Sequence, residues 1–401
     1  MPVPRFHWVL FAASFLLQLA CGMENYALIF YVRDLFGADK TAVGWISGGL
    51  DLAYLFGLLA FLRWRAPHPR KVLWLSTWSM ALTIAVYLVV PNWTVTFVFH
   101  ALFGLAMALF WPRVMGWLSW GVEGSSLTRT MGLFNISWSL GAILSPWLGG
   151  LLVELGPRWP FVVAVVLLLL TGLLMPIGSR LFPAMRAPAQ APASAHAGGA
   201  PVGAPLDPSS RPSPLRYAAR LGIGATYFLS GSLLFIFPAW AQDTLGFSES
   251  TSGGLLLVRM AVASLGFSLW GRLSFWHHKF WPLATGMGLL IVLTLLFPLG
   301  TSLWEFTLLF AASGFLFSFL YSTTLFHGVS GSVHRERSTT LHEAMINIGL
   351  FLGTVAGGWV SQTWTMGTAF VLCAAVLAGL LGLQGLMYKA TLNHARNHGP
   401  T

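Results

Sequence analysis

Residues 141–150 read Gly-Ala-Ile-Leu-Ser-Pro-Trp-Leu-Gly-Gly, and residues 349–358 repeat this spacing as Gly-Leu-Phe-Leu-Gly-Thr-Val-Ala-Gly-Gly. Small residues at such intervals let two helices approach closely, and a proline can bend one of them. The pattern favours a gating seam between helices, with ordinary tight packing as the alternative. The residues concerned are Gly141, Ser145, Pro146, Gly149, Gly150, Gly349, Gly353, Gly357 and Gly358.

The composition around these stretches excludes a water-soluble globular protein. Of the 401 residues, 56% are hydrophobic and only 8% are charged, whereas soluble domains contain about 25% charged residues. The apolar side chains must therefore meet lipid as well as each other. The net charge of +10 does not indicate nucleic-acid binding, because no soluble module supplies a basic face.

Twelve apolar runs are long enough to cross a bilayer, which requires about 20 residues for about 30 Å of hydrocarbon. Runs of this length predict helices, because barrel strands are shorter and alternate in polarity. The chain is thus expected to be an all-α, polytopic membrane protein with twelve transmembrane helices. The expected spans are 7–32, 41–62, 72–91, 94–118, 131–153, 160–182, 217–241, 252–271, 280–299, 302–328, 339–361 and 365–388.

The apolar pattern stops between two groups of six spans. An Ala/Pro-rich segment, residues 183–216, is expected to be a flexible cytoplasmic linker, because its composition cannot form a packed core. Residues 1–182 then form an N-terminal six-helix bundle. Residues 217–401 form a C-terminal six-helix bundle with a short cytoplasmic tail.

The basic residues predict the orientation. With both termini in the cytoplasm, nearly all Lys and Arg residues fall on the inner side, and only Arg33, Lys40 and Arg158 fall outside. This asymmetry follows the positive-inside rule. We expect a multi-pass protein of a bacterial cytoplasmic (inner) membrane.

The two halves of the chain are related by an internal duplication. A shift of 209 residues places Asp34 on Asp243 and Gly22 on Gly231, and the glycine stretches align at a shift of 208. Two homologous six-helix bundles are typical of transporters, in which a site near the membrane midplane opens to one side or the other.

The stretch 141–150 resembles the Gly-x-x-x-Gly-Pro-x-x-Gly-Gly motif of the major facilitator superfamily, with Ser145 in place of the second glycine. The resemblance extends over the chain outside the linker and tails. It implies two pseudo-symmetric bundles and solute transport by alternating access. The family's other signature, between the second and third spans, is degraded, because Phe61 stands at the acidic position that follows Gly57.

Four charged residues inside the spans are candidates for proton coupling or for a buried charge pair: Glu24, Asp51, Arg259 and Glu343. Each charge costs several kcal/mol in hydrocarbon, about 2.5–3.5 on insertion scales, so it marks a functional site by default. Arg259 either pairs with an acid of the other half, holds an anionic solute, or belongs to a static pair. Glu343 lies near the cytoplasmic end, so a gating or helix-end role competes with proton binding.

In the superfamily, the first, fourth, seventh and tenth spans line the cavity, and polar or aromatic stripes follow these spans here. Glu24 lies about 110° from the stripe of its own helix, so it is expected to face a neighbouring helix. His100 either shuttles a proton or is simply hydrogen-bonded. The cavity candidates are Gln18, Asn25, His100, Trp111, Asn135, Trp138, Tyr227, Ser230, Ser318, Tyr321 and Asn347.

These residues predict a secondary active transporter that moves a small organic solute, sugar-like or amphipathic, with coupling to protons. The alternative is a transport-inactive receptor or sensor that retains the fold, which the degraded signature favours. No ATP-binding motif, no catalytic constellation and no metal motif occur in the sequence, so no enzyme, cofactor or metal is expected. Cys21 and Cys373 lie in apolar runs, which excludes a disulfide scaffold. We expect a monomer in the lipid bilayer, with no nucleic-acid partner.

Overall fold

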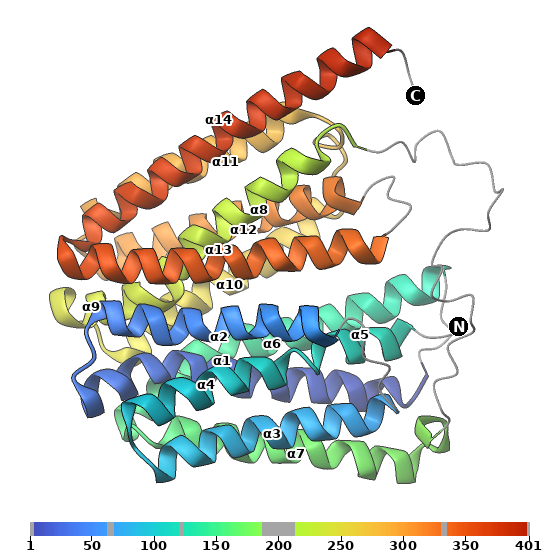
Figure 1. The fold of residues 1–401 in the computed structure, drawn as a ribbon, viewed down its shortest axis with the longest axis vertical. Coiled ribbons are helices and arrows are strands. Elements are labelled where there is room, and N and C mark those ends of the chain that lie inside the picture. Colours follow the sequence, from blue (N-terminus) through green and yellow to red (C-terminus); the bar gives the residue numbers. More distant parts are fainter. Residues whose placement is uncertain (1–3, 62–67, 120–123, 187–212, 330–334, 399–401) are drawn as a thin grey trace. The chain divides into compact units, whose positions relative to one another are not determined.

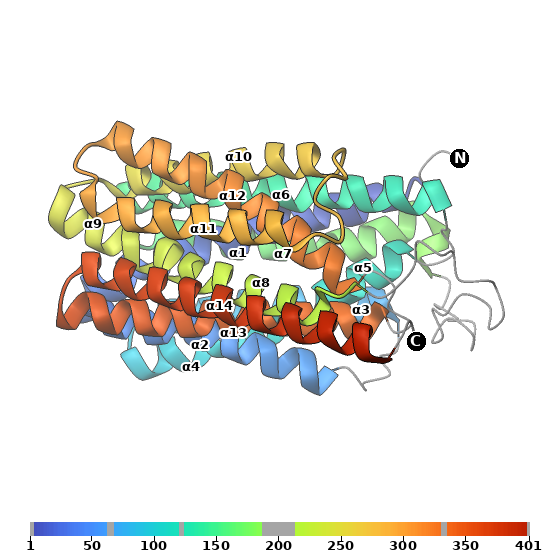
Figure 2. The same ribbon diagram turned by 90° about the horizontal axis from the view of Figure 1, so that it is seen from above.

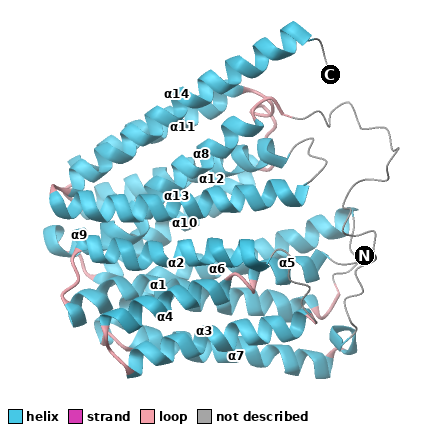
Figure 3. Ribbon diagram, in the orientation of Figure 1, coloured by secondary structure: helices cyan, strands magenta, loops and turns pink. Residues whose placement is uncertain are grey.

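The computed structural model describes residues 4–61, 68–119, 124–186, 213–329 and 335–398. Every regular element within these ranges is a helix, and none is a strand (Figure 3). Twelve of the described helical segments are long and apolar enough to cross a membrane. The predicted all-α fold with twelve spans is confirmed.

The contacts within the chain define two compact units. Unit 1 comprises residues 1–191 and 237–257, and unit 2 comprises residues 192–236 and 258–401. Residues 237–257 thus pack with unit 1, although they follow the predicted linker in sequence. The assignment of residues 1–182 and 217–401 to separate bundles stays a prediction.

The helices α1 to α7 of unit 1 are coloured from blue to green in Figure 1, and α9 is yellow. They are α1 (His7–Phe36), α2 (Lys40–Phe61), α3 (Pro69–Val89), α4 (Trp93–Met107), α5 (Trp111–Ser119), α6 (Gly124–Leu155), α7 (Trp159–Leu181), the 3₁₀ turn Pro183–Arg186 and α9 (Phe237–Leu245).

The helices of unit 2 are seen from a second direction in Figure 2. They are α8 (Arg216–Gly231), the π-helix Ser232–Ile236, α11 (Phe280–Leu296), the 3₁₀ turn Phe297–Leu299, α12 (Leu303–Val329), α13 (Arg335–Thr363) and α14 (Met366–His398). Helix α10 (Glu249–Trp270) begins in unit 1 and ends in unit 2.

Two of the twelve spans are confirmed as spans but contain an irregularity that the apolar pattern did not indicate. The span 94–118 breaks between α4 and α5, and the span 217–241 contains the π-helix Ser232–Ile236. Proline explains both, because it donates no hydrogen bond to the residue four positions earlier and its ring clashes with that carbonyl. Pro112 stands four residues after Ala108, and Pro238 four residues after Leu234.

The same helix pairings recur in both units, as the duplication predicts. In unit 1, α1 packs against α6 and α7, and α3 packs against α4 and α7. In unit 2, α8 packs against α13 and α14, and α11 packs against α12 and α14. The predicted pair of pseudo-symmetric bundles therefore rests on matching contacts as well as on matching sequence.

Small residues form the closest crossings in each unit. A side chain at Gly141 would meet the backbone of Phe15 in α1, and one at Gly353 would meet the backbone of Phe228 in α8. Ser145 lies against Gly22, and Thr354, one position after the equivalent of Ser145, lies against Gly231, the equivalent of Gly22. The two glycine stretches are therefore the seams along which α6 meets α1 and α13 meets α8.

The predicted linker, residues 183–216, lies mostly outside the described residues. Of this segment, Pro183–Arg186 form a 3₁₀ turn and α8 begins at Arg216.

Large apolar side chains on several helices are well exposed, among them Leu82 at 63% and Leu265 at 73%. Such exposure suits helices whose outer faces meet lipid.

Candidate functional site

A buried carboxyl group lies between three helices of unit 1, α1, α3 and α4. Glu24 of α1 accepts a hydrogen bond from the hydroxyl of Tyr87 in α3, with an oxygen-to-oxygen distance of 2.6 Å. The Nδ1 atom of His100 in α4 lies 3.0 Å from the same carboxyl oxygen, Oε1. None of the three side chains is exposed. We call these residues the Glu24 cluster.

The Glu24 cluster contains no fixed positive charge. Within the described residues of unit 1, neither Lys nor Arg forms an ion pair with Glu24, and His100 is its one possible cation. Oε2 of Glu24 and Nε2 of His100 have no hydrogen-bond partner. A carboxyl and an imidazole that share one proton are neutral as a pair, whereas loss of that proton leaves an uncompensated buried anion. The arrangement can therefore hold one proton.

Asp51 lies apart from this cluster, in α2. It is 6% exposed, its neighbours on the helix face, Ser47 and Tyr54, are also buried, and its Oδ2 atom has no hydrogen-bond partner. Asp51 is a second carboxyl group in unit 1 that is dehydrated and lacks an ion pair among the described residues.

Unit 2 contains a buried guanidinium group. Arg259 of α10 is 3% exposed and donates a hydrogen bond of 2.7 Å from Nη2 to the hydroxyl of Ser230 in α8. Its guanidinium carbon lies 4.8 Å from the ring centre of Phe317 in α12. Glu343 of α13 lies in the same unit, and the side chain of Asn347 donates to the Glu343 carbonyl at 2.8 Å.

The remaining cavity candidates divide by exposure. Partly exposed side chains belong to Gln18, Asn25, Trp111, Trp138, Tyr227 and Tyr321, and Asn135 is exposed. Buried side chains belong to His100, Ser230, Ser318 and Asn347. Their roles in solute binding stay predictions.

Several candidates are engaged within their own unit. Ser318 accepts a hydrogen bond of 3.1 Å from the indole of Trp270, and Trp138 donates to Asn135 at 3.2 Å. The predicted span 94–118 carries His100 and Trp111 on two different helices, because α4 ends at Met107 and α5 begins at Trp111. His100 faces Glu24, and it does so from the helix before the break.

Sequence reasoning missed a charge cluster where α1 ends and α2 begins. Arg33 and Lys40 both pair with Asp243 of α9, the Lys40 ammonium at 2.9 Å. Arg33 also donates to Gln242 at 2.8 Å, and Gln242 donates to Glu249 at 2.8 Å. We call these five residues the Asp243 cluster. The sequence did contain an indication of this cluster, because Arg33 and Lys40 are two of the three basic residues predicted on the outer side.

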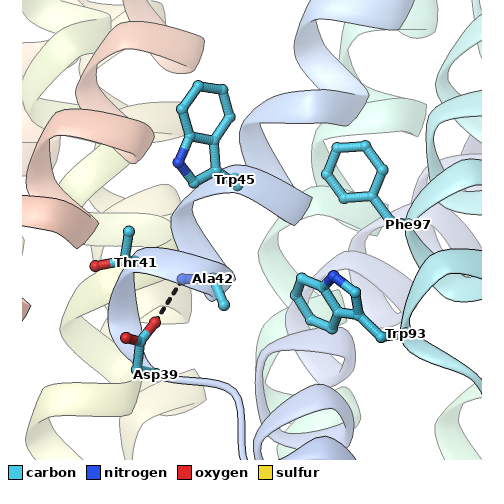
Figure 4. Close-up of a pocket in the computed structure, with 6 residues that line it drawn as sticks. All are labelled: Asp39, Thr41, Ala42, Trp45, Trp93 and Phe97. Atoms are coloured by element: carbon cyan, nitrogen blue, oxygen red, sulfur yellow. Dashed lines mark hydrogen bonds between the residues drawn. The ribbon is translucent and has the colours of Figure 1, made fainter.

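A surface hollow lies where α2 and α4 begin (Figure 4). It has a volume of about 500 Å³, and Trp45, Trp93 and Phe97 supply its aromatic side chains. Asp39, which also lines the hollow, accepts a hydrogen bond of 2.7 Å from the backbone N–H of Ala42. It thereby gives a partner to one of the N–H groups in the first turn of α2. Aromatic side chains at helix ends are common where a membrane meets water.

Comparisons with known proteins agree with this fold. The family model of the Major Facilitator Superfamily matches residues 10–333. No curated protein matches the chain. A POT family transporter, solved in complex with a thioalcohol-conjugated peptide, superposes with a TM-score of 0.75 at 13% identity over 97% of each chain.

Two other solved structures are similar. A bacterial homologue of the human lysosomal transporter Spinster, inward-facing and occupied, has a TM-score of 0.71 at 10% identity over 96% of each chain. The nucleoside transporter NupG has a TM-score of 0.69 at 15% identity, over 96% of this chain and 100% of its own. At such identities the similarity concerns the fold.

Proposed function

The chain belongs to the Major Facilitator Superfamily, and from this premise we propose that it is a proton-coupled secondary transporter of a small organic solute. It works by alternating access in a bacterial cytoplasmic membrane, with both termini in the cytoplasm. The charge asymmetry of its loops supports this orientation. The fold of multi-pass transporters supports the general activity.

The observation that carries proton coupling is the Glu24 cluster. Glu24 is fully buried, with Tyr87 and His100 as partners and no fixed cation, so the cluster as a whole is neutral only while it holds one proton. Release of the proton requires water or a cation to reach the cluster, since an isolated buried anion costs several kcal/mol. A conformational change that hydrates the cluster on one side of the membrane would therefore discharge the proton to that side.

The experiment is a flux measurement on the purified full-length chain in proteoliposomes. Solutes from several chemical classes are added with and without an imposed proton gradient, and solute uptake and internal pH are followed. Solute-dependent proton movement supports the proposal. Solute binding without movement of either species contradicts it and supports a receptor.

Asp51→Asn is expected to reduce proton-driven uptake while leaving folded protein in detergent. The substitution removes the second buried carboxyl group of unit 1 and changes its volume little. Uptake at a fixed pH gradient checks this, and size-exclusion chromatography checks folding. If the variant transports as well as the parent protein, Asp51 has no part in the mechanism.

The Asp243 cluster is proposed to stabilise one conformation of the transporter. Asp243→Asn removes both ion pairs, which as partly exposed pairs contribute about 0.2–1 kcal/mol each. We therefore expect amide hydrogen exchange in residues 237–250 to accelerate and the apparent affinity for the solute to change by about twofold to at most about thirtyfold.

The matched control is Asp34→Asn. Asp34 is the residue that the duplication aligns with Asp243, and the side chain of Asp34 is exposed. This substitution is expected to leave both quantities unchanged. Equal effects of the two substitutions would remove the Asp243 cluster from the proposed conformational change. A double substitution of Lys40 and Asp243 should be less than additive if the pair acts as a unit.

A further inference from the structure

Arg259 is fixed in place but is not neutralised. Its backbone crosses α12 at Gly314, where a side chain would collide with the Arg259 backbone. Ser230 accepts from Nη2, Phe317 lies beneath the guanidinium, and Nε has no hydrogen-bond partner. Among the described residues of unit 2, no carboxylate forms an ion pair with Arg259.

These contacts leave most of the guanidinium's bonding capacity unused. A hydroxyl group and an aromatic face compensate a buried cation only in part. The planar fork of arginine suits a carboxylate, which it binds through two parallel hydrogen bonds. Within the described part of unit 2, Arg259 therefore lacks an anionic partner.

Glu343 stands on the part of α13 that packs against α8. A Cβ atom at Gly349 of α13 would lie 3.1 Å from the Cβ atom of Tyr227 in α8. Glu343 forms no ion pair within the described part of unit 2. Glu343 and Arg259, which donates to Ser230 of α8, thus both lie beside α8, and no ion pair joins them.

Aromatic rings connect the two charges. The ring centre of Phe317 lies 5.4 Å from that of Tyr227 and 6.0 Å from that of Tyr321. Tyr321 in turn lies 5.4 Å from the ring of His342, the neighbour of Glu343 in α13. Such rings offer a surface against which an apolar or aromatic group can pack.

We propose that unit 2 binds a zwitterionic solute, an amino acid or short peptide with an apolar side chain. Its carboxylate contacts Arg259, its ammonium group contacts Glu343, and its apolar part packs on Phe317 and Tyr321. This inference rests on the proposed transport function and names its substrate class. It replaces the sugar-like solute that the neutral and aromatic stripes favoured, because those stripes did not show the two unpaired charges together.

The test measures binding to the full-length chain in detergent, by thermal stabilisation and by titration. The probes are phenylalanine and alanyl-phenylalanine, each with both ends free, with the amine acetylated, with the carboxylate amidated, or with both ends blocked. At least one free zwitterion is expected to bind, and blocking either end is expected to weaken its binding by about tenfold or more. Absence of binding by both zwitterions, or equal binding of all four forms, overturns the proposal.

Two variants assign each end of the solute to its residue. Arg259→Gln is expected to abolish the preference for the free carboxylate over the amide, and Glu343→Gln the preference for the free amine over the acetylated form. Arg272→Gln, at an exposed arginine after α10, is the control and keeps both preferences. If Arg259→Gln and Glu343→Gln also keep both preferences, neither residue contacts the solute, whatever the two substitutions do to stability.

The substrate class and the transport function fail in different ways. Transport of a neutral sugar that is indifferent to Arg259→Gln overturns the zwitterion site and leaves the transporter intact. A zwitterion that binds through Arg259 and Glu343 but moves neither itself nor protons across the membrane supports the site and overturns the function.

Discussion

Proteoliposomes that contain Glu24→Gln are expected to exchange solute across the membrane but not to accumulate it in response to a proton gradient. Glutamine still accepts the hydrogen bond from Tyr87, but it cannot release a proton. The cluster is then held permanently in the neutral state. A gradient of one pH unit supplies 1.36 kcal/mol per proton, which supports about tenfold accumulation, and the variant should show none.

Solute counterflow at equal pH on both sides checks that this variant still changes conformation. Such exchange requires the conformational change but no net proton movement. Glu305→Gln at the start of α12 is the matched control, since Glu305 is also a hydrogen-bonding carboxyl. It should accumulate solute normally. Accumulation by Glu24→Gln equal to that of the parent would exclude Glu24 as the proton site.

Gly353→Leu is expected to have the largest effect on folding. A Cβ atom at this position would lie only 2.6 Å from the carbonyl carbon of Phe228 in α8. Because the obstacle is backbone, α8 and α13 would have to separate. Overpacking of a core typically costs about 1–3 kcal/mol, so we expect a lower melting temperature in detergent and a smaller yield of monodisperse protein.

Gly379→Leu in α14 is the matched control for this prediction. Nothing lies within 4 Å of the Cβ position of Gly379, and the residue is exposed. The same added volume should therefore be tolerated there. Equal melting temperatures of the two variants would contradict the close crossing of α8 and α13.

The fold was predictable because the sequence patterns that indicate it extend over many residues and occur in both halves of the chain. Twelve apolar runs, a duplication and two glycine stretches all indicate paired helical bundles, and each could be read without knowing a contact. The interruptions at Ala108 and in Ser232–Ile236 were not predicted. Pro112 and Pro238 supplied a local signal for both, but the strength of the surrounding apolar runs favoured continuous helices.

The candidate site was predictable in its charges but not in its contacts. The helical position of Glu24 indicated a neighbouring helix rather than the stripe, yet Tyr87 and His100 are 63 and 76 residues away in sequence. No local pattern specifies such partners. The pairing of Asp243 with Arg33 likewise joins residues 210 positions apart, and only the unexplained outer charges pointed to it.

Coupling between solute movement and proton movement can be measured by adding a transported solute to proteoliposomes of the purified chain while the internal pH is recorded. We expect a solute-dependent change of internal pH, absent in protein-free vesicles and in Glu24→Gln. Solute movement at the full rate with no change of internal pH would show that the two movements are not coupled.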